Sequence, residues 1–133
     1  MIEGEVLEII NDPNDEGRGL NLLADQFRKG RPIRDLLKLL KSENQELVGI
    51  GAWIVGEIQI NEEEVQLLAP SLQELLKHEV SSIRFQAFNA LYPTLEANDD
   101  STRLLIERMC QDVNEGVRTA AKSAFERMKE FWN

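Results

Sequence analysis

The sequence predicts an all-α protein made of about four helical hairpins in a single domain. Three observations lead to this fold class. Similar segments recur at intervals of 30–36 residues along the chain. The apolar residues inside each segment follow a helical period. Each copy also contains a short polar stretch that separates two such apolar runs, which is the pattern of a helix–turn–helix repeat.

The repeat is clearest when three segments are aligned on Leu40, Leu76 and Cys110. The apolar positions then coincide through the rest of each copy, at Leu47, Ile83 and Val117, at Gly51, Ala87 and Ala121, at Ile54, Ala90 and Ala124, and at Val55, Leu91 and Phe125. A weaker first copy lies 30 residues earlier, with Asp12, Leu20 and Ala24 in register. The predicted repeats span about 2–30, 32–58, 62–96 and 100–131 of the domain 1–133.

The first two copies contain both a clear and an ambiguous element. Ile2, Val6 and Ile9 fall on one helical face near the start of the chain. Residues 48–55, with two glycines and several β-branched residues, are also compatible with a buried strand. Because their register matches two helical copies, we expect a helix there, which each glycine destabilises by about 1 kcal/mol relative to alanine.

The last two copies carry stronger helix signals. Asn61 precedes three glutamates, and Glu64 stands at the spacing of a capping box. Pro70 is expected to bend or split the helix that follows, and Pro93 to end or kink the next one. In the fourth copy, apolar residues at 104–110 are expected to pair with those at 117–128.

Composition excludes several classes of function. The chain has 15 basic and 24 acidic side chains, a net charge of −9, so we expect neither nucleic acid nor a membrane as partner. With one Cys and one His, the chain can form no internal disulfide and offers no plausible set of zinc ligands. The opening residues lack the pattern of a signal peptide, and no apolar run is long enough for a membrane span. The sequence therefore predicts a cytoplasmic protein.

Residue patterns typical of catalysis are nearly absent. His78 lies in a predicted turn, where a hydrogen-bonding or exposed role is expected. Cys110 occupies an apolar position of the repeat and is expected to be a small buried side chain. No phosphate-binding glycine loop and no nucleophile motif occurs. We therefore predict no enzyme, no catalytic residue, no metal and no cofactor.

A kinked first helix, an acidic turn and the pattern Val-Arg-x-x-Ala-x-x-Ala together resemble the HEAT repeat and its armadillo-type relatives. The matching residues are Asp112, Val117, Arg118, Ala121 and Ala124, with Ile83, Arg84, Ala87 and Ala90 one copy earlier. The resemblance covers about residues 5–130. It implies a right-handed α-solenoid whose second helices line a concave side.

The resemblance also implies a ladder of Asp and Arg side chains between neighbouring repeats. Asp12 with Arg18, and Asp112 with Arg118, are candidates for it. The ladder is expected to be broken in the middle, because Val48 stands in the place of the usual Arg. Ser42 and His78 likewise stand where the family has Asp.

Aromatic residues on the second helices are the first candidate binding site. A stripe facing away from the core includes Trp53, Phe85, Asn89 and Tyr92, with Gly49 and Gly56 leaving space around Trp53. Trp and Tyr are common interface anchors. The alternative is that these rings pack against a neighbouring helix or a returning terminus.

Acidic residues in the turns are the second candidate. They are expected along one edge of the stack and are Asp12, Asp15, Glu16, Glu43, Glu46, Glu79, Asp112 and Glu115. Such a ridge would steer a basic partner, whereas the alternative is that these acids only cap helices. The basic segment 28–34 is either an anion site or, in the preferred interpretation, a solvated loop.

The favoured function is a non-enzymatic module that binds a basic protein. An immunity protein that neutralises a basic nuclease toxin fits this chemistry, and a generic adaptor or assembly factor fits nearly as well. By resemblance, a HEAT-like subunit of a chromophore lyase is an alternative. A protein like the DNA-alkylation repair enzymes is less favoured, because those need a basic cleft. The oligomeric state is left open.

Overall fold

The computed structural model describes residues 1–132, and within them the chain is all-helical, with eight α-helices and no strand. The α-helices are α1 (Ile2–Ile10), α2 (Arg18–Arg28), α3 (Arg34–Leu40), α4 (Gln45–Glu57), α5 (Glu62–Leu75), α6 (Ser81–Leu91), α7 (Asp100–Met109) and α8 (Glu115–Met128). Two short 3-10 helices, η1 (Tyr92–Thr94) and η2 (Lys129–Phe131), follow α6 and α8. The predicted all-α class is confirmed.

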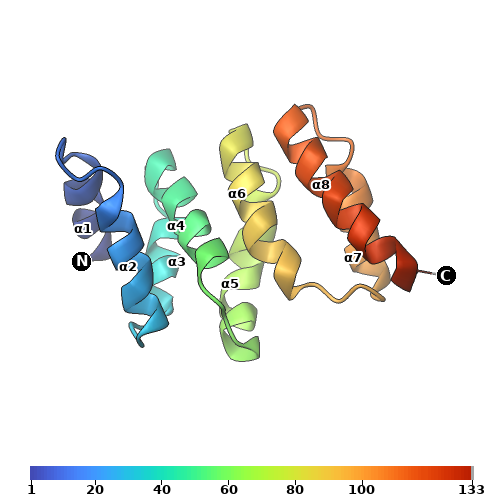
Figure 1. Cartoon of the computed structure of the whole chain (residues 1–133), viewed down its shortest axis with the longest axis horizontal. Coiled ribbons are helices and arrows are strands. Elements are labelled where there is room, and N and C mark those ends of the chain that lie inside the picture. Colours follow the sequence, from blue (N-terminus) through green and yellow to red (C-terminus); the bar gives the residue numbers. More distant parts are fainter. Residues whose placement is uncertain (133) are drawn as a thin grey trace.

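The helices are arranged in two rows (Figure 1). In one row, α2 packs against α4, α4 against α6, and α6 against α8. In the other row, α1 packs against α3 and α3 against α5. The turns that connect α1 to α2, α3 to α4, α5 to α6 and α7 to α8 all lie along the upper edge in this view. Each predicted repeat therefore contains one pair of consecutive helices.

All four of these turns contain the same side-chain to backbone hydrogen bond. A side-chain acceptor receives the backbone N–H of the residue two positions later. The donor–acceptor pairs are Asn14 to Asp12 (2.9 Å), Asn44 to Ser42 (3.1 Å), Val80 to His78 (3.0 Å) and Asn114 to Asp112 (2.8 Å). Ser42 and His78 thus supply the acceptor that Asp supplies in the other two turns.

Helix termini follow the sequence signals. The predicted capping box is present, with Asn61 and Glu64 each accepting the other's backbone N–H at 2.9 Å. Pro93 follows the end of α6, as expected. Pro70 does not split its helix, since α5 is a single helix from Glu62 to Leu75. Pro70 and Gln66, whose carbonyl loses its usual partner, are both exposed, so water can satisfy that carbonyl.

The ambiguous stretch 48–55 lies within α4, so the helical interpretation is confirmed. The predicted inward stripe of Leu47, Gly51, Ile54 and Val55 is buried. A Cβ placed on Gly51 would lie 2.8 Å from the Cβ of Leu39, whereas one on Gly49 would meet only Ile83 Cγ1 at 3.8 Å. Gly51 therefore permits α3 and α4 to approach closely, and Gly49 has no such role.

Replacing these two glycines by alanine should have opposite effects on stability. Gly51→Ala is expected to lower the free energy of unfolding by about 1–2 kcal/mol, because overpacking against Leu39 outweighs the gain in helix propensity. Gly49→Ala is expected to raise it by about 0.5–1 kcal/mol. Urea unfolding followed by circular dichroism measures both. Stabilisation by both variants would contradict a packing role for Gly51.

Candidate partner-binding surface

The outward stripe of the second helices is accessible in the structure. None of its nine positions is buried, namely 49, 53 and 56 on α4, 85 and 89 on α6 with 92 in η1, and 119, 123 and 126 on α8. Trp53, Phe85 and Tyr92 are half-buried and Asn89 is exposed. The three aromatic rings thus combine contact with the core and contact with solvent.

Trp53 lines a surface pocket of about 400 Å³ that we call the Trp53 pocket. Gly49, Ile50 and Trp53 of α4 form one part of it, and Ile83 and Gln86 of α6 form another. Glu46, in the first turn of α4, is the charged residue among those that line it. The pocket therefore joins an aromatic side chain to a turn acid, two features that the sequence suggested separately.

Phe85 lines a second pocket, of about 580 Å³, between α6 and α8, which we call the Phe85 pocket. Glu115, Gly116, Thr119, Ala120 and Ser123 of α8 complete it. These α8 residues occupy the repeat positions held in α4 by the residues that line the Trp53 pocket, namely Gln45, Glu46, Gly49, Ile50 and Trp53. The two pockets are therefore built on equivalent surfaces of different hairpins.

The structure does not bring the aromatic residues together in one pocket. Trp53 and Phe85 line different pockets, and Tyr92 lines neither. The Tyr92 ring instead stacks on the buried ring of Phe88, with centroids 5.9 Å apart and an interplanar angle of 24°. Tyr92 therefore packs on α6, the helix that directly precedes it, so its ring is partly used within the protein.

The turn acids differ in whether they already bind another group of the protein. Glu43, Glu46, Glu79 and Glu115 are exposed, and within residues 1–132 none has a cationic side chain within 4 Å. Asp15 is half-buried and accepts the backbone N–H of Gly19 at 3.0 Å, so it acts as a local cap. Glu16 is paired with Arg18 at 2.9 Å.

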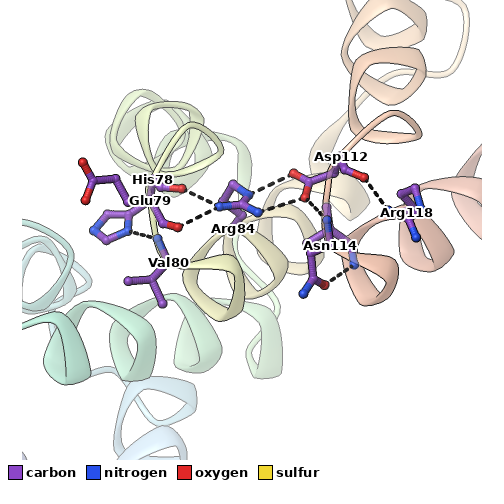
Figure 2. A network of polar contacts seen from close by, with 8 residues as sticks. His78, Glu79, Val80, Arg84, Asp112, Asn114 and Arg118 are labelled. Carbon is purple, nitrogen blue, oxygen red and sulfur yellow. Dashed lines mark hydrogen bonds and ion pairs between the residues drawn. The ribbon is translucent and has the colours of Figure 1, made fainter.

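Asp112 belongs to a polar network between the third and fourth hairpins rather than to a free acidic edge (Figure 2). Nε and Nη2 of Arg84 donate to its two carboxylate oxygens, both at 2.9 Å. The same guanidinium donates to the carbonyls of His78 (2.8 Å) and Glu79 (3.1 Å). The Arg84 side chain is 11% exposed and that of Asp112 is 10% exposed. These hydrogen bonds and charges lower the pKa of Asp112 and raise that of Arg84.

The network corrects the expected ladder pairs. Asp112 binds Arg84 of the preceding hairpin through its carboxylate, whereas Arg118 donates to the backbone carbonyl of Asp112 at 2.8 Å (Figure 2). Arg84 makes the same bond to the carbonyl of His78, one repeat earlier. Arg18 pairs with Glu16 and not with Asp12. Each of these Asp side chains accepts a backbone N–H within its own turn.

Two of the four cationic side chains of the basic segment 28–34, Arg28 and Arg31, are paired within the described residues. Arg31 forms a bidentate pair with Glu5, at 2.6 and 3.0 Å, and also contacts Asp35 at 3.1 Å. The hydrogen bond from Arg31 lowers the pKa of Glu5. Arg28 binds Asp25 and the carbonyl of Glu57. These pairings favour a structural role for Arg28 and Arg31 over anion binding.

The described part of the chain offers little reactive chemistry. Among residues 1–132, no group of three or more His, Cys, Asp or Glu side chains is arranged to hold a metal ion. Cys110 is half-buried rather than fully buried, and desolvation raises the pKa of its thiol. In the same residues, none of the helices combines the length and apolar character required to span a membrane.

Comparison with known proteins gives no match to any family model, to any curated protein or to any solved structure.

Proposed function

We infer that the chain is a non-enzymatic protein-binding module whose second-helix face engages a basic protein partner. The observation that carries this inference is the Trp53 pocket, in which a half-exposed indole, an adjacent glycine and a carboxylate line one depression. Trp is strongly enriched among residues that dominate binding energy. A carboxylate beside the ring favours a positively charged partner group.

We further infer that the four hairpins form a short right-handed α-solenoid of the HEAT-like type. Two features support this inference: the turn hydrogen bond that recurs in every hairpin, and the row in which α2, α4, α6 and α8 pack in sequence order. In such stacks each repeat contacts its neighbours and presents equivalent positions side by side. Repeated surfaces of this kind suit the recognition of an extended or large partner.

Charge supports a basic partner over a neutral one. The net charge is −9, and the four glutamates Glu43, Glu46, Glu79 and Glu115 lie at or next to the turns on one edge. Such a field accelerates encounter with a cationic protein, and the effect weakens as salt increases. A cytoplasmic immunity protein that captures a basic nuclease toxin is one function with these requirements. An adaptor for a basic assembly partner is the other.

The test is affinity capture from the source cells with two tagged forms of the chain. One form is wild type, and the other carries Trp53→Ala and Glu46→Lys together. We expect the wild type to retain a basic protein at low salt and to lose most of it at moderate salt. At low salt the double variant should retain at least tenfold less of this protein. Leu104→Ala, a change at an exposed residue of α7, which is a first helix, serves as the matched control.

Unfolding curves of all three proteins must show that the double variant is folded under the capture conditions. Equal retention of the partner by the variant and the wild type would contradict the proposed surface. Recovery of only the chain itself would contradict the proposed function and indicate a homo-oligomer.

A further inference from the structure

The Trp53 and Phe85 pockets share a chemistry that goes beyond their common place in the repeat. Each is lined by one aromatic side chain and one glutamate, Trp53 with Glu46 and Phe85 with Glu115. No lysine or arginine lines either pocket. We propose that the two pockets are successive subsites for the cationic side chains of one extended peptide segment of the partner, a proposal that rests on the proposed function.

The Trp53 subsite can satisfy both parts of a lysine or arginine side chain, and the Phe85 subsite offers the same two groups from different helices, Phe85 from α6 and Glu115 from α8. Glu46 and Trp53 are seven residues apart, which is close to two helical turns, so both lie on the same face of α4. A long basic side chain can pack its methylene stem on the ring and direct its charged head to the carboxylate. A cation near the face of an aromatic ring is further stabilised by electrostatic attraction to the ring quadrupole.

The carboxylates of these subsites are free within the described part of the chain. No cationic side chain of residues 1–132 lies within 4 Å of Glu46 or Glu115. Seven of the 24 acidic side chains form ion pairs within the described residues, among them Glu5 with Arg31 and Asp112 with Arg84, and Glu46 and Glu115 are not among these seven. The negative charge of both pockets is therefore available to a cationic group of a partner.

The separation of the two pockets determines the spacing that we expect between basic residues of the peptide. One pocket is lined mainly by α4 and α6, with Leu20 of α2, and the other by α6 and α8, so the two lie about one helix apart, a step of roughly 8–10 Å for packed helices. A polyproline II segment advances about 3.1 Å per residue and returns to the same side every three residues, a rise of about 9.3 Å. The partner segment should therefore carry basic residues three positions apart.

The experiment titrates the full chain with three synthetic ten-residue peptides. The first has arginines at every third position separated by proline pairs, the second has the same composition with adjacent arginines, and the third has glutamine in place of arginine. The chain has two tryptophans, so the indole N–H signals of its ¹⁵N spectrum report on the pocket directly. The Trp132 indole donates to the carbonyl of Ala97 and serves as the internal reference.

We expect the first peptide to shift the Trp53 indole and to leave the Trp132 indole in place. Its affinity should exceed that of the second peptide by about tenfold, and the glutamine peptide should not bind measurably. Glu46→Gln and Glu115→Gln should each weaken binding about fivefold to tenfold. Glu130→Gln, at an exposed acid in η2, is the matched control and should leave the affinity unchanged.

Three results would overturn the proposal: no shift of the Trp53 indole at saturating peptide, equal affinity for the first two peptides, or unchanged affinity in Glu115→Gln. The outcome of the capture experiment separates these failures from a failure of the proposed function. If capture depends on Trp53 while the peptides do not bind, the partner-binding function stands and the peptide subsites are wrong. If capture also fails, both are wrong.

Discussion

Asp112→Ala is expected to lower the free energy of unfolding by about 3–5 kcal/mol, because it leaves the Arg84 guanidinium without its counter-ion in a mostly buried position. The loss also removes the acceptor for the backbone N–H of Asn114, so the turn between α7 and α8 is weakened at the same time. The fourth hairpin contacts the third mainly through α6 and α8. The Arg84–Asp112 pair joins α6 to the turn before α8 and therefore links the two hairpins directly.

Urea unfolding followed by circular dichroism measures this loss, with Glu107→Ala as the matched control. Glu107 pairs with Arg103 at 2.9 Å, but both side chains are more than 40% exposed. A pair of that kind contributes at most about 1 kcal/mol. Equal losses in Asp112→Ala and Glu107→Ala would show that the network does not link the hairpins.

The same pair should make stability depend on pH in acid. The folded-state pKa of Asp112 is lowered, chiefly by the hydrogen bonds from Arg84. Its contribution is therefore fully present above the ordinary aspartate pKa of about 4 and is lost as the pH falls through the lowered folded-state value. The difference in unfolding free energy between wild type and Asp112→Asn should narrow below about pH 4 and stay constant between pH 5 and 8.

The helices and turns could be predicted from the sequence because their signals are local. The capping box at Asn61 and the helix end before Pro93 depend on neighbours within a few residues. The repeat register also placed Leu47, Ile54 and Val55 correctly in the core. The register also placed Gly49 beside Trp53, and both residues line the Trp53 pocket in the structure.

The contacts between hairpins could not be predicted in the same way. The resemblance offered Asp112 with Arg118 as members of a ladder between neighbouring repeats, but it did not indicate that the carboxylate of Asp112 binds Arg84 of the preceding hairpin. The requirement for glycine at position 51 could not be predicted either, because it depends on how closely α3 approaches α4. The division of Trp53 and Phe85 between two pockets also follows from the distance between helices and not from their spacing along the chain.

Phe88 is the clearest case in which one residue departs from the repeat and has a large expected effect. Its repeat equivalents are Ala52, which is buried, and Lys122, which is exposed, so the pattern does not mark it as core. In the structure its side chain is 1% exposed and stacks against Tyr92. It lies one helical turn after Arg84 and therefore on the side of α6 that reaches Asp112.

Phe88→Ala is expected to lower the free energy of unfolding by about 3–5 kcal/mol, because the lost ring leaves a cavity on the side of α6 that faces the fourth hairpin. Phe88→Leu should cost about 1–1.5 kcal/mol, since it keeps most of the volume. Phe131→Ala, at a ring that is 62% exposed, is the control and should change stability by less than about 0.5 kcal/mol. Chemical unfolding measures all three variants.

If Phe88→Ala behaved like Phe131→Ala, the third and fourth hairpins would be held together by the Arg84–Asp112 network without the ring. Combining Phe88→Ala with Asp112→Ala distinguishes the two links, because a loss smaller than the sum of the single losses shows that they stabilise the same interface.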